Sequence, residues 1–188
     1  MEKTIEALKH FVPMCEQEEA DKEIFLDCAK RFPKSLTRES QLFHFTSSAV
    51  VLNEGHDKIC AIHHNLYNSW GWMGGHADGE EDLLKVARTE VEEECGIKNL
   101  RMYKDGIFSL ESMSVFSHFK KGKYVPAHVH LNVTYVFVAS EDEVLRIRES
   151  ENSDVSWFSF KEFIEKSTEE YMKPIYKKIF DRIEAVGN

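Results

Sequence analysis

The stretch that decides the fold of this chain is a glycine turn followed by an acidic helix, GGHADGEEDLLKVARTEVEEECGI at residues 74–97. Asp78 and Glu80 offer hydrogen-bond acceptors and negative charge at the predicted helix start, and Gly96 supplies a stop. An apolar stripe at helical spacing is formed by Leu84, Ala87, Val91 and Cys95. The stretch therefore predicts a helix that docks on a sheet.

Three glutamates of this helix, Glu90, Glu93 and Glu94, fall within an arc of roughly 100° beside the apolar stripe. Like charges a few ångströms apart repel by about 3 to 4 kcal/mol per pair at an effective dielectric near 20, so a cation, protonation or solvation must compensate. Oxygen-only ligands favour Mg²⁺, with Mn²⁺ as the alternative. The competing interpretation is a solvated glutamate-rich helix face.

The spacing of glycines and glutamates resembles the signature of the Nudix hydrolase superfamily, the MutT-like enzymes. The matching positions are Gly75, Glu81, Glu90, Val91, Glu93, Glu94, Gly96 and Ile97. Thr89 departs from the signature, because the family has an arginine there that helps to orient the glutamates. Arg88 lies one position earlier, about 100° away around the helix. The resemblance implies an α/β fold, an α/β/α sandwich with a mixed sheet.

The resemblance also implies an activity, namely hydrolysis of a nucleoside diphosphate linked to another group, with water attacking a phosphorus of the pyrophosphate bridge. We assign Glu90, Glu93 and Glu94 as ligands of Mg²⁺ and as catalytic residues, with Glu90 also the general base. The Gly75 carbonyl is expected as a further ligand, and Glu81 as a support of the turn. The family often recruits one more carboxylate from outside the motif. Four candidates stay open: Glu111, Glu149, Glu151 and Asp154.

Composition limits the class of the protein. A chain of 188 residues with 42% hydrophobic residues is long enough for one domain with an appendage. The net charge of −9 argues against nucleic-acid or membrane partners and leaves a small nucleotide-like diphosphate as the substrate. Neither an apolar leader nor a run of about 18 apolar residues is present, which predicts a cytoplasmic protein. The four cysteines lack metal-site spacing and are expected as reduced, buried thiols.

The order of patterns along the chain predicts an N-terminal helical extension at residues 1–40 and the Nudix hydrolase domain at residues 41–188. The extension is interpreted as a cap on the domain or as a homodimer contact. Within the domain, strands are expected at residues 45–52, 59–63, 101–113, 114–119, 127–139 and 155–160, and helices at residues 161–166 and 169–185.

Several side chains outside the acidic helix are candidates for substrate contact. The turn is expected to hold His76 beside the acidic helix, and His128 and His130 fall on the polar side of the strand at 127–139. A His-x-His pair can also bind metal, but no third ligand follows at a recognisable spacing. Trp70 is predicted to stack on a base or to pack in the core, and Lys123 to contact phosphate or to lie in a solvated turn.

Two other functions stay open. An isomerase of isoprenyl diphosphate shares the fold and a Gly-His pair similar to Gly75 and His76, but those enzymes use a catalytic cysteine where this chain has Gly74. A non-catalytic module that senses a nucleotide or contacts a protein would be consistent with Thr89 in place of arginine. Metal-dependent release of phosphate or nucleotide separates the hydrolase from the binding module.

Overall fold

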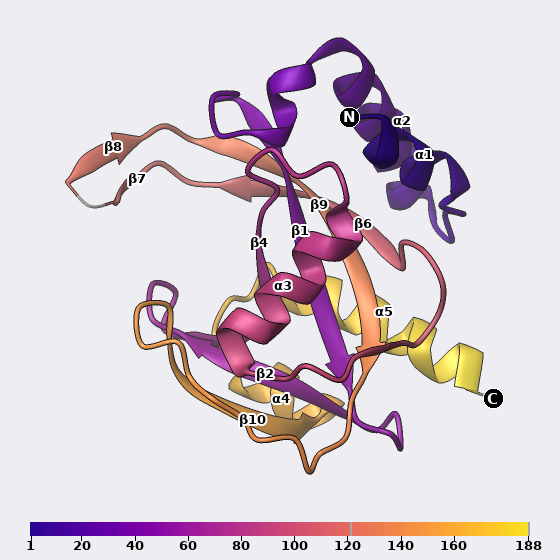
Figure 1. Ribbon diagram of the computed structural model, residues 1–188, viewed down its shortest axis with the longest axis vertical. Helices are drawn as coiled ribbons and strands as arrows, with labels where there is room; N and C mark the ends of the chain where they lie inside the picture. Colours follow the sequence, from indigo (N-terminus) through magenta and orange to yellow (C-terminus); the bar gives the residue numbers. More distant parts are fainter. Residues whose placement is uncertain (121, 188) are drawn as a thin grey trace. The chain divides into compact units, whose positions relative to one another are not determined.

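The computed structural model describes residues 1–120 and 122–187, without the side chain of Lys120, and Figure 1 shows its elements. Its helices are α1 (Glu2–His10), α2 (Glu16–Arg31), the 3-10 turn η1 (Pro33–Leu36), α3 (Leu83–Cys95), α4 (Phe160–Lys166) and α5 (Lys173–Gly187). Its strands are β1 (Phe43–Leu52), β2 (Lys58–His64), β3 (Ser69–Gly71), β4 (Met73–His76), β5 (Arg101–Met102), β6 (Ser109–Val115), β7 (His118–Lys120), β8 (Lys123–Val125), β9 (His128–Val138) and β10 (Asn152–Ser159).

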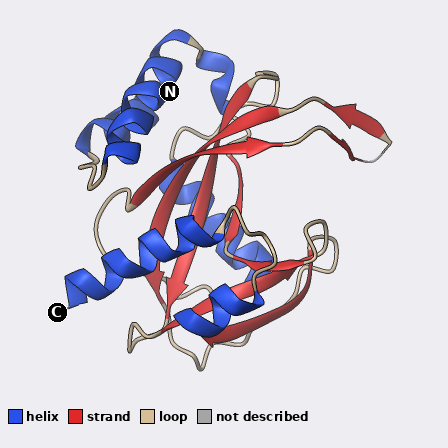
Figure 2. Ribbon diagram, turned by 180° about the vertical axis from the view of Figure 1, so that it is seen from behind, coloured by secondary structure: helices blue, strands red, loops and turns tan. Residues whose placement is uncertain are grey.

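A mixed sheet in the order β10-β2-β1-β9-β5 is the centre of the fold, with β3 paired to β2, β4 to β1 and β6 to β9. The strands β7 and β8 pair as a hairpin that continues from β6 and β9 (Figure 1). Sheet and helices together confirm the predicted α/β class (Figure 2). Among the described residues, none of the helices has the length and apolar character that crossing a bilayer requires.

The chain divides into two compact units. The first unit consists of residues 1–48, 74–87 and 105–135, and the second of residues 49–73, 88–104 and 136–188. Both units take residues from β1, α3 and β9, because these elements run through the boundaries.

In the first unit, α2 packs against α1 and against β6. The ring of Phe25 in α2 meets that of Phe45 in β1 edge to face, with centroids 5.9 Å apart. Gln17 donates a hydrogen bond to the Leu110 carbonyl at 2.9 Å, and Asp21 accepts one from the Ser112 amide at 3.0 Å. These contacts hold the N-terminal helices on the sheet of this unit, while the domain boundary at residue 40 stays a prediction.

The glycine turn of the first unit depends on close backbone contact with β1. A Cβ at Gly74 would lie 2.7 Å from the Ser48 hydroxyl and 2.9 Å from the Ser47 carbonyl oxygen, so only glycine fits. The Ala77 amide donates to the Phe45 carbonyl at 3.1 Å. Gly79 has a φ of 96°, a left-handed conformation that favours glycine. The turn therefore places His76 next to β1.

The predicted cap of the acidic helix is wrong in detail. Asp82 precedes α3 and accepts a hydrogen bond from the Lys85 amide at 3.2 Å, the usual role of an N-cap residue. Asp78 instead pairs with Arg38, and Glu80 pairs with the Lys85 ammonium group at 2.6 Å. A short loop thus separates the glycine turn from the helix, whereas the sequence placed the helix start within the turn.

The apolar stripe of α3 is confirmed at three of its four predicted positions, the buried Ala87, Val91 and Cys95. Leu84 is only half-buried, and the neighbouring Leu83 is 2% exposed instead. At the first turn of α3 the buried face therefore includes Leu83 rather than Leu84. Gly96, with a φ of 82°, ends the helix as predicted.

In the second unit, α4 packs on β2, β3 and β10 and contacts α5. A reciprocal pair of hydrogen bonds between Ser159 and Glu162 caps α4 at its N-terminus. The rings of Phe160 and Phe180 are stacked, with centroids 4.2 Å apart.

All four cysteines are free; Cys60 and Cys95 are buried as predicted, while Cys15 and Cys28 are partly exposed.

Candidate functional site

The candidate metal site of the second unit is a group of three carboxylates, Glu90, Glu94 and Glu151, called here the acidic trio. One oxygen of each lies within 4.8 Å of the others. Glu90 and Glu94 are four residues apart on α3 and so lie on one face of the helix. Glu94 is only 2% exposed, and Glu151 directly precedes β10. A set of hard oxygen ligands in this arrangement could hold a divalent cation.

Of the four candidates outside the motif that the sequence left open, Glu151 is the one grouped with Glu90 and Glu94. Glu149 and Asp154 are exposed. Glu111 lies in the first unit.

Glu93 has a different environment from the two neighbouring glutamates. It is exposed, and its carboxylate accepts a hydrogen bond from the Arg148 guanidinium at 2.6 Å. The same guanidinium nitrogen lies 3.4 Å from Glu151. Arg148 thus links Glu93 to a member of the acidic trio, and Glu93 as a metal ligand stays a prediction.

Arg148 places a positive charge beside Glu93 and Glu151. Thr89, at the position of the family arginine, is exposed. Arg88 is used elsewhere, because its guanidinium lies 4.9 Å from the ring centroid of Phe137 and donates to the Leu100 carbonyl at 3.0 Å. Sequence reasoning missed Arg148, because nothing in the motif points to a residue so much later in the chain.

The loop that carries Arg148 and Glu151 is fixed to the end of α3 by hydrogen bonds. Asn152 is fully buried and donates to the Glu94 carbonyl at 2.8 Å, and its side-chain oxygen accepts from the Arg148 amide at 3.1 Å. The Arg146 amide donates to the Cys95 carbonyl at 2.9 Å. These bonds place residues 146–152, called here the Arg148 loop, beside the acidic helix.

Glu111 is a buried member of a polar network in the first unit. Its carboxylate accepts hydrogen bonds from Asn132 at 3.1 Å and from the Thr134 hydroxyl at 2.9 Å. The Ser109 hydroxyl contacts both Glu111 and, at 2.9 Å, Glu18 of α2. Glu111 therefore joins α2 to β6 and β9, and it is not a member of the acidic trio.

Three of the predicted substrate contacts, His76, His128 and His130, lie together in the first unit with a fourth histidine that the sequence did not indicate, His44. The ring centroids of His44 and His128 are 4.8 Å apart, and those of His128 and His130 are 5.0 Å apart. Burial lowers the pKa of His44 below its usual value, so its neutral form is favoured.

None of the contacts described for the remaining predicted residues joins them to the acidic trio or to the four histidines. Trp70 in the second unit is half-buried, and its ring packs 4.7 Å from Phe158, which agrees with the core-packing alternative. Lys123 is exposed in β8, and Lys121 of the same basic loop lies outside the described residues. Gly75 is half-buried in β4. Glu81 forms an ion pair with the Met1 amino group, which lowers its pKa.

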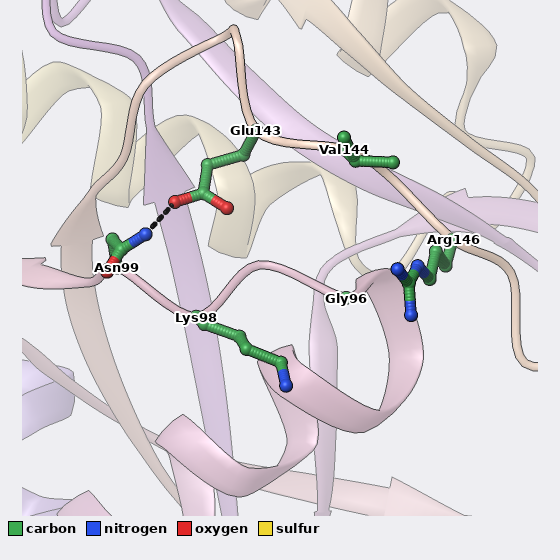
Figure 3. A pocket seen from close by; sticks show the side chains of 6 residues that line it. All are labelled: Gly96, Lys98, Asn99, Glu143, Val144 and Arg146. Atoms are coloured by element: carbon green, nitrogen blue, oxygen red, sulfur yellow. Dashed lines mark hydrogen bonds between the residues drawn. The ribbon is translucent and has the colours of Figure 1, made fainter.

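A pocket of about 310 Å³ lies in the second unit at the C-terminal end of α3 (Figure 3). Its lining residues are Gly96, Lys98, Asn99, Glu143, Val144 and Arg146. Asn99 and Glu143 hydrogen bond to each other at 2.5 Å across one side (Figure 3). Since none of the predicted catalytic residues lines this pocket, it is not the candidate site.

Comparison with known proteins identifies a matching family model and several similar proteins. The family model of the NUDIX domain matches residues 42–182, well over half of the chain. The RNA pyrophosphohydrolase of Pelagibacter ubique is 28% identical over 144 residues, which cover 74% of this chain and 90% of that protein. A C. elegans Ap4A hydrolase has a TM-score of 0.56 at 16% identity, over 75% of this chain and 97% of that one.

The E. coli dihydroneopterin triphosphate pyrophosphohydrolase has a TM-score of 0.55 at 11% identity, over 73% of this chain and 95% of that one. At such identities these two structures show the shared fold. The family match rests on the sequence itself, and it includes the acidic helix and the Arg148 loop. The chain therefore belongs to the Nudix hydrolase family, as the spacing of its glycines and glutamates predicts.

Proposed function

We propose that the protein is a Mg²⁺-dependent pyrophosphohydrolase that cleaves a nucleoside diphosphate linked to another group. The observation that carries the proposal is the acidic trio, in which Glu90, Glu94 and Glu151 bring oxygens within 4.8 Å of one another. Three negative charges at that separation favour a divalent cation strongly. An all-carboxylate donor set suits Mg²⁺, and Mn²⁺ is the alternative.

Each residue of the site has a separate part in the proposed reaction. Bound Mg²⁺ would neutralise charge on the diphosphate, which is the main requirement of phosphoryl transfer. Glu90, half-buried on α3, takes the proton of the attacking water. Arg148 holds Glu93 and Glu151 through its guanidinium and so orients the acidic side chains. It takes the role that the motif arginine has in the family.

The other assignments of the sequence complete the proposal. The Gly75 carbonyl is a further metal ligand, Glu93 belongs to the catalytic glutamates, and Glu81 supports the turn. The proposed substrate contacts are His76, His128, His130, Trp70 and Lys123. Glu111 has a supporting role through its network with α2. The cytoplasmic location and the homodimer expected from the sequence stay predictions.

The substrate is proposed to be a small nucleotide-like diphosphate. A net charge of −9 disfavours a long polyanion, because counterion release needs clustered lysines and arginines. An RNA is the second candidate substrate, because a relative that is 28% identical is named an RNA pyrophosphohydrolase. Dinucleoside polyphosphates, nucleoside triphosphates and sugar nucleotides represent the first class in a test.

The test measures release of phosphate or nucleotide from this panel, and from an RNA with a 5′ triphosphate, with Mg²⁺, with Mn²⁺ and with a chelator. Turnover of a small nucleotide that chelation abolishes supports the proposal. Turnover of RNA alone would replace the proposed substrate class. Double-bond movement in isoprenyl diphosphate would replace the hydrolase by the isomerase, and nucleotide binding without turnover would favour the non-catalytic module.

A further inference from the structure

A second group of potential metal ligands lies in the first unit and contains no carboxylate. It consists of His44 from β1, His76 from β4 and His130 from β9, called here the histidine trio. One ring nitrogen of each lies within 4.8 Å of the others. The ring centroids are 5.0 Å apart in every pair. Three strands that are far apart in the sequence therefore converge on one point.

His44 has the hydrogen bonding that is typical of a metal-ligating histidine. Its Nδ1 lies 3.1 Å from the Ser40 carbonyl oxygen, which can only accept, so Nδ1 carries the proton. The lone pair is then on Nε2. The side chain is 5% exposed, and its Nε2 is buried without a hydrogen-bond partner among the described residues. Ligating histidines commonly donate the other ring N–H to a backbone carbonyl in this way.

His128 flanks the histidine trio and has the same hydrogen bonding. Its Nδ1 donates to the Pro126 carbonyl at 2.8 Å, which leaves the lone pair on Nε2. That atom lies 3.2 Å from Nε2 of His130. Two nitrogens bound to one tetrahedral Zn²⁺ at 2.0–2.1 Å are about 3.3 Å apart. Either His130 donates its proton to His128, or both lone pairs face a cation.

We propose that His44, His76 and His130 bind a divalent transition-metal ion, of which Zn²⁺ is the representative. Imidazole nitrogens suit Zn²⁺ and its neighbours in the transition series, whereas Mg²⁺ prefers oxygen. The buried lone pair of His44 gains a partner, which the protein groups described around it do not supply.

The proposal is tested by metal binding, so it does not depend on the proposed hydrolase activity. The full chain is stripped with a chelator, and Zn²⁺ binding is measured by equilibrium dialysis and calorimetry. The Glu94→Gln variant serves as the background, because it weakens the acidic trio and isolates binding elsewhere. We expect at least one equivalent of Zn²⁺ in the parent and one in the Glu94→Gln variant, and the absorption of bound Co²⁺ should show nitrogen ligation without a thiolate charge-transfer band.

The decisive variant is His130→Gln in the same background, with His10→Gln as the control, since His10 is exposed on α1. We expect His130→Gln to weaken Zn²⁺ binding by about 100-fold, since even outer-shell partners of a ligand contribute 10–100-fold. His76→Gln, at a half-buried position, gives the same result if His130→Gln does not fold. Unchanged Zn²⁺ affinity in a folded variant, a thiolate band, or no Zn²⁺ bound by the parent would overturn the proposal.

Discussion

The acidic trio and the histidine trio show two ways in which a chain builds a cluster of potential metal ligands. Two of the three acidic ligands come from one helix, so their spacing of four residues is visible in the sequence. The histidines come from three strands, and no spacing rule joins them. Candidate ligands on one helix can thus be recognised from their spacing in the sequence. Candidate ligands on different strands are close together only in the folded structure.

The chemistry of the two groups differs as much as their origin. The acidic trio offers hard carboxylate oxygens, and the histidine trio offers imidazole nitrogens on buried or half-buried rings. Hard cations such as Mg²⁺ prefer the first, and transition metals accept the second. A protein with both would respond to two kinds of cation independently. The following variants test whether each group behaves as its ligands predict.

The largest effect is expected from Glu94→Gln, which removes a charged ligand from the acidic trio. Metal-assisted charge stabilisation is worth several kcal/mol, so kcat/KM with Mg²⁺ should fall by at least about 100-fold. Glu92→Gln is the matched control, because Glu92 is exposed on the same helix and pairs with Lys98 at 3.2 Å. Near-normal turnover in a folded Glu94→Gln protein would contradict the assignment.

Gly74→Ala tests the position of β4, the strand that carries His76 of the histidine trio. The added methyl group would lie 2.9 Å from a backbone oxygen of β1, so β4 must shift. Overpacking of this kind costs about 3 kcal/mol, measured as the change in the free energy of unfolding in urea. Gly55→Ala is the control, since only the Asp57 side chain comes as close as 3.1 Å there. Equal stability of the two variants would show that the contact is not restrictive.

Asn152→Ala tests the attachment of the Arg148 loop to α3. The variant leaves the Glu94 carbonyl and the Arg148 amide without their buried partner, which costs about 2 kcal/mol of unfolding free energy. Turnover should fall as well, because Glu151 loses its fixed position. Asn99→Ala, which removes an exposed hydrogen bond in the same unit, is the comparison. A stable Asn152→Ala protein with full activity would exclude the loop from the site.

The smallest effect is expected from Arg148→Gln. The guanidinium orients glutamates, and such outer-shell contacts change activity by about 10-fold. The loss should appear in kcat rather than in KM, with partial rescue by Arg148→Lys. The melting temperature should change little, because exposed ion pairs contribute at most about 1 kcal/mol. A change in melting temperature without a change in kcat would mean that Arg148 has only a structural role.

The sequence predicted what depends on local spacing. The α/β class and the helix that ends at Gly96 follow from patterns over a few residues, and of the three glutamates predicted to converge, Glu90 and Glu94 lie together. The detail that was wrong is also local. Asp82 caps α3 instead of Asp78, because the helix begins at Leu83, five residues after Asp78.

What the sequence could not predict depends on contacts between distant residues. In the sequence His44 is simply part of a predicted β-strand, and its contact with His76 and His130 appears only in the folded structure. Arg148 and Asn152 reach α3 from a loop without any motif. Glu151 could be named among four candidates but not chosen, because the choice depends on how that loop turns.

The hydrogen bonds between the Arg148 loop and α3 have a consequence for the diversification of such enzymes. On the proposed assignment, one loop supplies both a carboxylate and its guanidinium partner, so a few substitutions there would change the catalytic rate while the glycine–glutamate signature stays unaltered. Two homologues with identical signatures can then differ widely in speed. Exchanging residues 146–152 between them would transfer that difference in catalytic rate.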